Sequence, residues 1–192
     1  MKLYSNRPSP YGRKVLTVIH EKQLVQKIEI IQIDPWSDPA DLLAATPVGK
    51  VPALVTDVGL LLTESTTISE YLDEIGYGSR LIEGNRWEVL GRVGVAQGLI
   101  DAAFGTVIER RRPVERQLPD WVSRLGRAID RTLSRSSAPR SRFDLGDISL
   151  ACGLAYLDFR LPDIPWRTRY PELAAWLDDV NGRPSMQATK PP

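Results

Sequence analysis

Ser9-Pro10-Tyr11-Gly12 joins a predicted strand to a predicted helix, and this junction decides the fold. Residues 2–5 read as a short strand and residues 6–8 as a turn. The apolar residues from Val15 to Ile19 predict one face of a helix, with Ser9 at its N-cap and Pro10 at its first position. A hydroxyl is therefore expected where backbone N–H groups converge and the helix dipole favours negative charge.

The position of Ser9 is chemically informative, because thioredoxin-like redox proteins place a Cys-x-x-Cys motif at such a junction. Here Ser9 and Gly12 stand at the two cysteine positions. The junction is suited to stabilising a thiolate, but it contains no thiol of its own. Any thiol that reacts here must arrive on a ligand.

The composition excludes several classes of protein. The 192 residues include 25 basic and 24 acidic ones, so no overall charge favours nucleic acid or membrane. One cysteine excludes an internal disulfide, and one histidine argues against a zinc centre or a histidine-dependent triad. The start of the chain lacks a signal-peptide pattern and no apolar run is long enough to span a bilayer, so we expect a cytoplasmic protein.

The first part of the chain alternates strands and helices. The pattern predicts β-α-β-α-β-β-α, with the later elements at residues 26–33, 40–45, 53–55, 60–62 and 63–75. Beyond this part strand signals stop. We therefore expect a thioredoxin-like domain over residues 1–76, a linker over 77–84 and an all-helical domain over 85–192. The first 78 residues hold 7 basic and 10 acidic side chains and the rest hold 18 and 14, which also indicates two modules.

Helices are predicted in the second part at residues 87–112, 120–133 and 171–180, with a loop over 134–142. The first of them contains four glycines, which predict close helix packing or a bend. Another helix begins at a clear signal. Asp144 is its N-cap, Asp147 holds the capping-box position, and Phe143 and Ile148 form a hydrophobic staple.

Four motifs in this order resemble the glutathione S-transferase family over essentially the whole chain. They are Ser9-Pro10 with Arg13-Lys14-Val15, Pro47-x-Gly49-Lys50-Val51-Pro52-x-Leu54, Thr63-Glu64-Ser65, and the staple and capping box at residues 143–148. The pattern is most similar to bacterial members with serine or cysteine at the start of the first helix.

The resemblance implies a glutathione site. The Val51-Pro52 bond is expected to be cis, with the backbone of Val51 pairing with the cysteinyl unit of glutathione. Glu64 and Ser65 are expected to bind the γ-glutamyl end, through its ammonium and its carboxylate. Lys50 is placed for the glycyl carboxylate, and Ser9 is expected to donate its O–H to the sulfur.

Each of these residues also has a purely structural explanation. Ser9-Pro10 is an ordinary start of a helix, Glu64-Ser65 is compatible with helix capping alone, and Lys50 with a solvated loop. Asn6 and Tyr11 are alternative groups for activating the thiol and are also candidates for the substrate site. The other candidates for that site are Trp36, Trp87, Phe104 and Arg111. Asp101 is a candidate for contact with glutathione across a subunit interface.

We therefore expect a glutathione transferase that joins glutathione, its co-substrate, to a small apolar electrophile, in a detoxifying role and without a metal. The resemblance also implies a homodimer. Two other functions stay open: a non-catalytic glutathione-binding or regulatory protein, and a glutathione-dependent reductase or thioltransferase. Such reductases typically have cysteine at the position of Ser9, and Cys152 is expected to be a buried apolar residue rather than a nucleophile.

Overall fold

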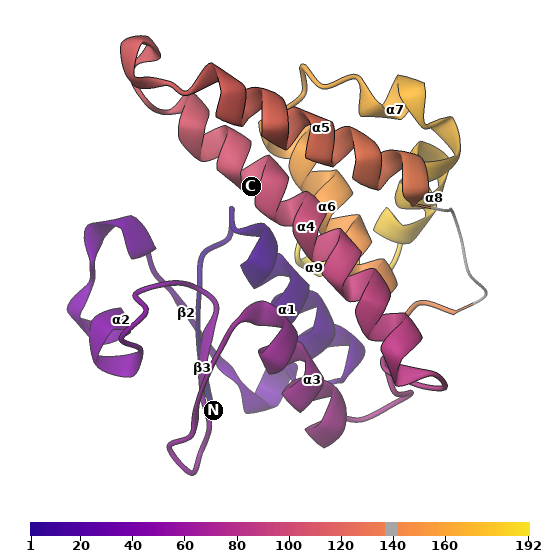
Figure 1. Ribbon diagram of the computed structural model, residues 1–192. Helices are drawn as coiled ribbons and strands as arrows, with labels where there is room; N and C mark the ends of the chain where they lie inside the picture. The colour runs from indigo at the N-terminus through magenta and orange to yellow at the C-terminus, as the bar shows by residue number, and fades with distance from the viewer. Residues whose placement is uncertain (137–141) are drawn as a thin grey trace. The chain divides into compact units, whose positions relative to one another are not determined.

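The computed structural model describes residues 1–136 and 142–192 and divides into two compact units (Figure 1). The first unit comprises Met1–Gly84 and Arg183–Pro192, and the second comprises Asn85–Gly182. The C-terminal segment thus packs with the first unit, whereas the sequence placed it in a helical domain over 85–192. Part of the loop expected over 134–142 lies outside the described residues.

The first unit is built on a four-stranded sheet. Its strands are β1 (Lys2–Ser5), β2 (Glu29–Gln32), β3 (Ala53–Val55) and β4 (Leu61–Thr63), in the spatial order β2-β1-β3-β4. β1 and β2 are parallel, and the other two pairs are antiparallel. Three helices complete this core and confirm the predicted order β-α-β-α-β-β-α: α1 (Pro10–Glu21), α2 (Ala40–Ala45) and α3 (Ser65–Ile75). The sequence did not predict the two short 3₁₀ helices, Val25–Lys27 and Pro35–Ser37.

Helix α1 is buried on several sides, and its neighbours explain the place of the C-terminal segment. It packs against α3 and against α9 (Pro184–Ala188), a helix that the sequence did not predict. The hydroxyls of Thr17 and Thr189 lie 3.1 Å apart. Near the end of α1, the Glu21 carboxylate accepts hydrogen bonds from Arg183 and Ser185. These contacts attach the end of the chain to the first unit.

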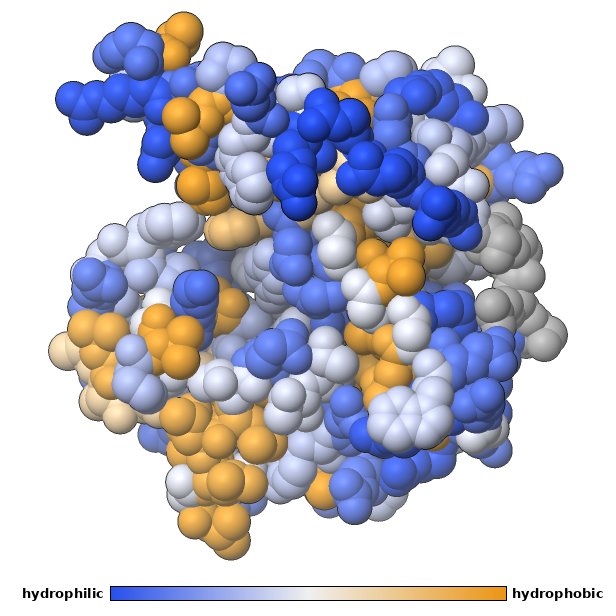
Figure 2. Space-filling view, in the orientation of Figure 1, coloured by the Kyte–Doolittle hydropathy of each residue, from blue (hydrophilic) through white to orange (hydrophobic). Residues whose placement is uncertain are grey.

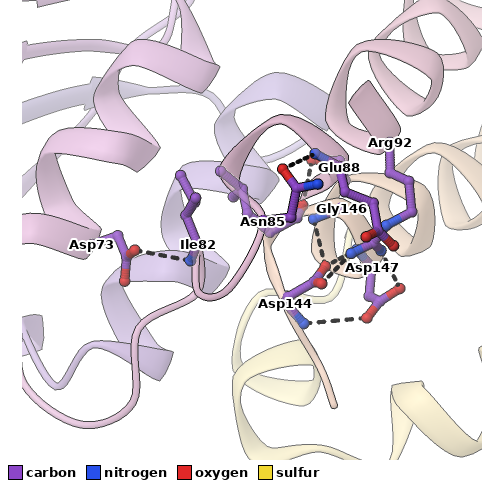
Figure 3. Close-up of polar contacts among 10 residues, drawn as sticks. Asp73, Ile82, Asn85, Glu88, Arg92, Asp144, Gly146 and Asp147 are labelled. Atoms are coloured by element: carbon purple, nitrogen blue, oxygen red, sulfur yellow. Dashed lines mark hydrogen bonds and ion pairs between the residues drawn. The ribbon is translucent and has the colours of Figure 1, made fainter. Parts of the chain in front are cut away.

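A buried ion pair joins the end of α1 to α3. Lys22 Nζ lies 3.1 Å from Asp73 Oδ1, and each side chain is only 1% exposed. The same carboxylate accepts hydrogen bonds from the backbone N–H groups of Leu81 and Ile82, the second of which is drawn in Figure 3. A buried charge needs such partners because leaving water is costly. Asp73 therefore fixes the chain where it leaves α3.

The second unit is all-helical, as the sequence predicted. It contains α4 (Arg86–Arg110), α5 (Pro119–Arg135), α6 (Leu145–Arg160), α7 (Trp166–Arg169) and α8 (Pro171–Asn181), with a 3₁₀ turn at Val114–Arg116. Helix α4 packs along both α5 and α6. α7 is too short to show a hydrophobic period and was not predicted.

The glycines of α4 do not all serve the close packing that we expected. A Cβ at Gly105 would lie 3.2 Å from Leu125 of α5, so this glycine does permit close approach. A Cβ at Gly91, Gly94 or Gly98 would meet no atom within 4 Å in the part of the chain that the structure describes. These three therefore do not serve close packing among the described residues, and they form an open stripe on one face of α4 because they are spaced by three and four residues.

The start of α6 carries the predicted capping box (Figure 3). Asp144 Oδ1 accepts from the N–H groups of Gly146 and Asp147, and Asp147 Oδ2 accepts from the N–H of Asp144. The guanidinium of Arg92, on α4, forms ion pairs with both carboxylates. A Cβ at residue 146 would lie 2.7 Å from Arg92 Nη1, so glycine there permits the close approach of this arginine.

Candidate functional site

The expected glutathione-binding segments of the first unit meet at one end of the sheet. Tyr4 pairs with Ala53 and Ala53 pairs with Thr63 across antiparallel ladders. The residues that follow β1, precede β3 and follow β4 therefore lie at the same end. These are residues 6–9, Val51-Pro52 and Glu64-Ser65. The topology thus brings together three segments that are far apart in the sequence.

Ser9 is the N-cap of α1, as predicted. Its Oγ accepts a hydrogen bond of 3.1 Å from the N–H of Gly12, and its own N–H donates to the carbonyl of Asn6 at 2.9 Å. The side chain is half-buried, and its O–H donates to no acceptor in the described part of the chain. Its proton is therefore available to a ligand at the start of the helix.

Gly12 allows the helix to begin close to β1. A Cβ at this position would lie 2.6 Å from Ser5 Oγ and 3.3 Å from the carbonyl oxygen of Asn6. Ser5 is fully buried and its hydroxyl has no partner among the described residues. Any larger residue at position 12 would thus push the N-terminus of α1, with Ser9, away from the end of β1. The sequence indicated this junction but not the packing reason for its glycine.

The segment before β3 has the expected conformation. The Val51-Pro52 peptide bond is cis, Pro52 is buried and Val51 is half-buried. Gly49 has φ +62°, a conformation that favours glycine. Lys50 is exposed, so its ammonium is open to water or to a ligand carboxylate.

Glu64 and Ser65 form the start of α3. Glu64 is the N-cap, with φ +73°, and its Oε2 accepts from the N–H groups of Thr66 and Thr67 at 2.9 and 3.2 Å. Its Oε1 accepts from the hydroxyls of Ser65 and Thr66 at 3.1 and 3.4 Å. A non-glycine residue with positive φ is uncommon and is found often at functional sites. The structure therefore shows Glu64 in the capping role, which the sequence allowed as an alternative to ligand binding.

Lys14 is a residue of this site that sequence reasoning missed. It is fully buried, and its Nζ donates a hydrogen bond of 3.0 Å to Thr66 Oγ1. Burial would raise the pKa of Glu64, but the Thr66 N–H, the charge of Lys14, the Thr67 N–H and the Ser65 hydroxyl together lower it. Lys14 thus stabilises the ionised carboxylate and links α1 to α3. The sequence did contain a signal for this burial: Lys14 lies four residues before Val18, which is buried, so the two share one face of α1.

The remaining candidates fall into both units. The Asn6 amide donates to the carbonyl of Ile33 at 3.0 Å, so it fixes the turn after β1. Tyr11 is half-buried in the first turn of α1, and Trp36 is 64% exposed. The second unit contains the others: Trp87, Asp101, Phe104 and Arg111. Asp101 accepts a hydrogen bond of 3.0 Å from Gln97.

Cys152 agrees with the interpretation of the sequence, and the single histidine lies at the end of a helix. Cys152 is 1% exposed in the middle of α6, which suits a small apolar residue. His20 lies in the last turn of α1, where a cation is favourable with the dipole.

Within the described ranges, no three or more His, Cys, Asp or Glu side chains form a possible metal site. No helix in these ranges is long and apolar enough to cross a bilayer.

Comparison with known proteins identifies two family models. The N-terminal domain of glutathione S-transferase matches residues 8–75, and the C-terminal domain matches residues 114–179. Among curated proteins, the uncharacterised GST-like protein YibF of Escherichia coli is 29% identical, over 100% of this chain and 99% of its own.

Solved structures are similar over the whole chain. A glutathione transferase family member from Pseudomonas fluorescens with bound glutathione is 38% identical, with a TM-score of 0.92, covering 100% of this chain and 98% of its own. A Pseudomonas fluorescens structure with bound S-(propanoic acid)-glutathione is 37% identical, with a TM-score of 0.88 and full coverage of both chains. A glutathione S-transferase from Methylobacillus flagellatus with bound glutathione is 30% identical, with a TM-score of 0.92, covering 100% and 99%.

Proposed function

Because the chain belongs to the glutathione S-transferase family, we propose that it is a glutathione transferase that joins the glutathione thiolate to a small apolar electrophile. The observation that carries this proposal is the Ser9 hydroxyl, held at the N-terminus of α1 at the same sheet end as Val51 and Glu64. The glutathione bound in the Pseudomonas and Methylobacillus relatives supports the co-substrate. The S-(propanoic acid)-glutathione in the second Pseudomonas structure supports room for a substituent on the sulfur.

Ser9 has the role of thiolate stabiliser in this proposal. A free thiol has a pKa near 8.5, so only about 3% is ionised at pH 7. Lowering that pKa by roughly two units stabilises the anion by about 2.7 kcal/mol and makes most of the bound thiol nucleophilic. The Ser9 O–H and the N-terminus of α1 act in this direction, because both stabilise negative charge.

Glu64 and Ser65 have the role of binding the γ-glutamyl end. A carboxylate offers about four acceptor sites, and Glu64 already receives four donors. The ammonium must therefore replace one of them. The Ser65 hydroxyl is suited to leave, because it opens α3 and can turn to donate to the ligand carboxylate. Val51 supplies the backbone partners of the cysteinyl unit, and Lys50 the cation for the glycyl carboxylate.

The protein is further proposed to be a cytoplasmic homodimer with a detoxifying role. The open glycine stripe of α4 supports dimerisation, since a second copy can approach the backbone closely there. Apolar residues reach the visible surface in several groups (Figure 2). On α4, the exposed residues include Trp87 and Val95. In this arrangement Asp101 is a candidate for the glutathione ammonium of the other copy.

One experiment separates the proposal from its alternatives. Conjugation of glutathione to a generic aryl halide is measured beside retention on immobilised glutathione. A transferase does both. A binding or regulatory protein is retained without conjugation, and a thioltransferase reduces a mixed disulfide instead. Absence of both retention and conjugation contradicts the proposed function.

A further inference from the structure

The C-terminal ends of α4 and α6 lie together in the second unit. α4 packs along α6 and ends at Arg110, and α6 ends at Arg160. The guanidinium of Arg110 donates two hydrogen bonds, of 2.8 and 2.9 Å, to the carboxylate of Asp163 in the segment after α6. This bidentate pair holds the two helix ends at one place.

Two arginines at this place lack an acidic partner. Arg110 is paired with Asp163, and Arg112 lies 3.6 Å from Glu109. Arg111 and Arg160 have no carboxylate within ion-pair distance among the described residues. In the same part of the chain, the buried Nε of Arg160 has no hydrogen-bond partner. The C-terminal ends of α4 and α6 thus carry two positive charges that no carboxylate in the described part of the chain compensates.

Tyr156 lies on α6 close to the end that carries Arg160, and it adds a hydroxyl donor. It precedes Arg160 by one helical turn, is 5% exposed, and makes no hydrogen bond to any described residue. Burial raises the pKa of Tyr156, while the charges of Arg160 and Arg111 act in the opposite sense. The phenol therefore stays protonated at neutral pH and can donate, and both guanidinium charges act on it.

Helix-end stabilisation explains only part of this arrangement. Cations are favourable at helix C-termini, and Arg160 also lies over the Phe159 ring, 4.1 Å from its centroid. These contacts leave the Arg160 Nε and the Tyr156 hydroxyl without partners. A planar carboxylate satisfies both kinds of donor, because arginine binds it through two parallel N–H groups.

The surface beside the cations is apolar. Phe104 and Ile108 precede Arg111 by seven and three residues, so the three share one face of α4. Phe104 and Ile108 are half-buried, and Arg111 is exposed. A ligand bound along this face would have an apolar body and an anionic end.

We propose that Arg111, Arg160 and Tyr156 form a carboxylate-binding site, and that the electrophile of this protein is a small apolar molecule bearing a carboxylate. That the carboxylate belongs to the electrophile rests on the proposed transferase function. In the reaction used as a test, the glutathione sulfur forms a bond to a ring carbon of 4-chloro-3-nitrobenzoate. Chloride leaves with the electron pair of the broken C–Cl bond.

The test compares this acid with its uncharged amide, 4-chloro-3-nitrobenzamide. Arg111→Gln and Arg160→Gln should each lower kcat/KM for the acid by about tenfold and change it less than about twofold for the amide. Arg112→Gln is the matched control, since it removes the neighbouring positive charge that Glu109 already pairs. The ratio of kcat/KM for the acid to kcat/KM for the amide should be the same in Arg112→Gln as in the wild type. Equal losses for both substrates, or the same ratio in all variants, would overturn the proposal.

Binding without turnover separates this proposal from the proposed function. Ligand-observed NMR of 3-nitrobenzoate and 3-nitrobenzamide with the full chain should show tighter binding of the acid, lost in Arg111→Gln and kept in Arg112→Gln. Because Arg111 is exposed, Arg111→Gln should fold and still tests the proposal if Arg160→Gln does not fold. Acid binding without any conjugation would contradict the transferase but support the carboxylate site. Equal binding of acid and amide by the wild type would refute the site.

Discussion

The Ser9 hydroxyl oxygen accepts a hydrogen bond of 3.1 Å from the N–H of Gly12. A hydroxyl has one proton to donate and two lone pairs to accept with, so this contact leaves the proton free. Helix capping and thiolate stabilisation are therefore compatible roles for the same side chain. The two roles contribute to different quantities, stability and thiol pKa, which allows them to be measured separately.

Glu64→Gln should weaken glutathione binding by at least tenfold, about 1.4 kcal/mol, because the ligand ammonium loses an ionic acceptor. Calorimetric titration measures the affinity. Glu74→Gln is the matched control, since it removes an exposed carboxylate near the other end of α3. Unchanged affinity in Glu64→Gln would remove Glu64 from the site.

Lys14→Met should raise the pKa of Glu64, because the buried ammonium is one of the groups that lower it. In the wild type this pKa lies below the ordinary glutamate value of 4.5. The stability that the ionised cap gives α3 is thus fully present above pH 4.5 and is lost as pH falls through the lower folded-state pKa. In the variant that loss should begin at higher pH. NMR titration of the carboxyl carbon, with exposed Lys2→Met as control, measures the shift. An unchanged pKa would mean that Lys14 acts on packing alone.

Asp73→Asn should lower the free energy of unfolding by about 3–5 kcal/mol, since it leaves the buried Lys22 ammonium without its anion. Asp57→Asn, at an aspartate whose side chain is 81% exposed, should cost less than about 1 kcal/mol. Denaturant unfolding of the two variants gives the comparison. Similar small losses in both would show that the buried pair is not a main support of α3.

Gly94→Leu should convert the proposed dimer into a folded monomer. A Cβ at Gly94 meets nothing within 4 Å among the described residues, so a side chain there should not disturb the monomer, but it would block the close approach of a second copy. Gly126→Leu on α5 is the control, because a Cβ there is equally unhindered. Light scattering at micromolar concentration reads the mass. A monomeric wild type contradicts the dimer, and a dimeric Gly94→Leu contradicts this interface.

Much of the secondary structure in both units was predictable because its signals are local. The caps at Ser9 and Asp144 and the order of strands and helices follow from residues close in sequence. The strand predicted over 26–33 is shorter in the structure, Glu29–Gln32, because residues 25–27 form a 3₁₀ turn. The helix predicted over 120–133 extends from Pro119 to Arg135.

The features that sequence reasoning missed depend on tertiary contacts. Helix α9 is too short to show a period, and its place follows from contacts of Thr189 and Arg183 with α1. Lysine is normally a surface residue. Lys14 and Lys22 are nevertheless both fully buried, one on either side of Val18 in the sequence. Their spacing of four residues from Val18 places them on the core face, but only the structure shows the oxygen atoms that receive them.

The pKa of the glutathione thiol bound to Ser9→Ala tests the central claim most directly. The ultraviolet absorbance of the thiolate, followed against pH, should show a pKa one to two units above that of the wild-type complex, because a charge-assisted hydrogen bond of about 1.5–3 kcal/mol is lost. Ser9→Thr keeps both the hydroxyl and the cap and should titrate like the wild type. A Ser9→Ala complex that loses about 1 kcal/mol of stability but keeps the wild-type thiol pKa would contradict the account.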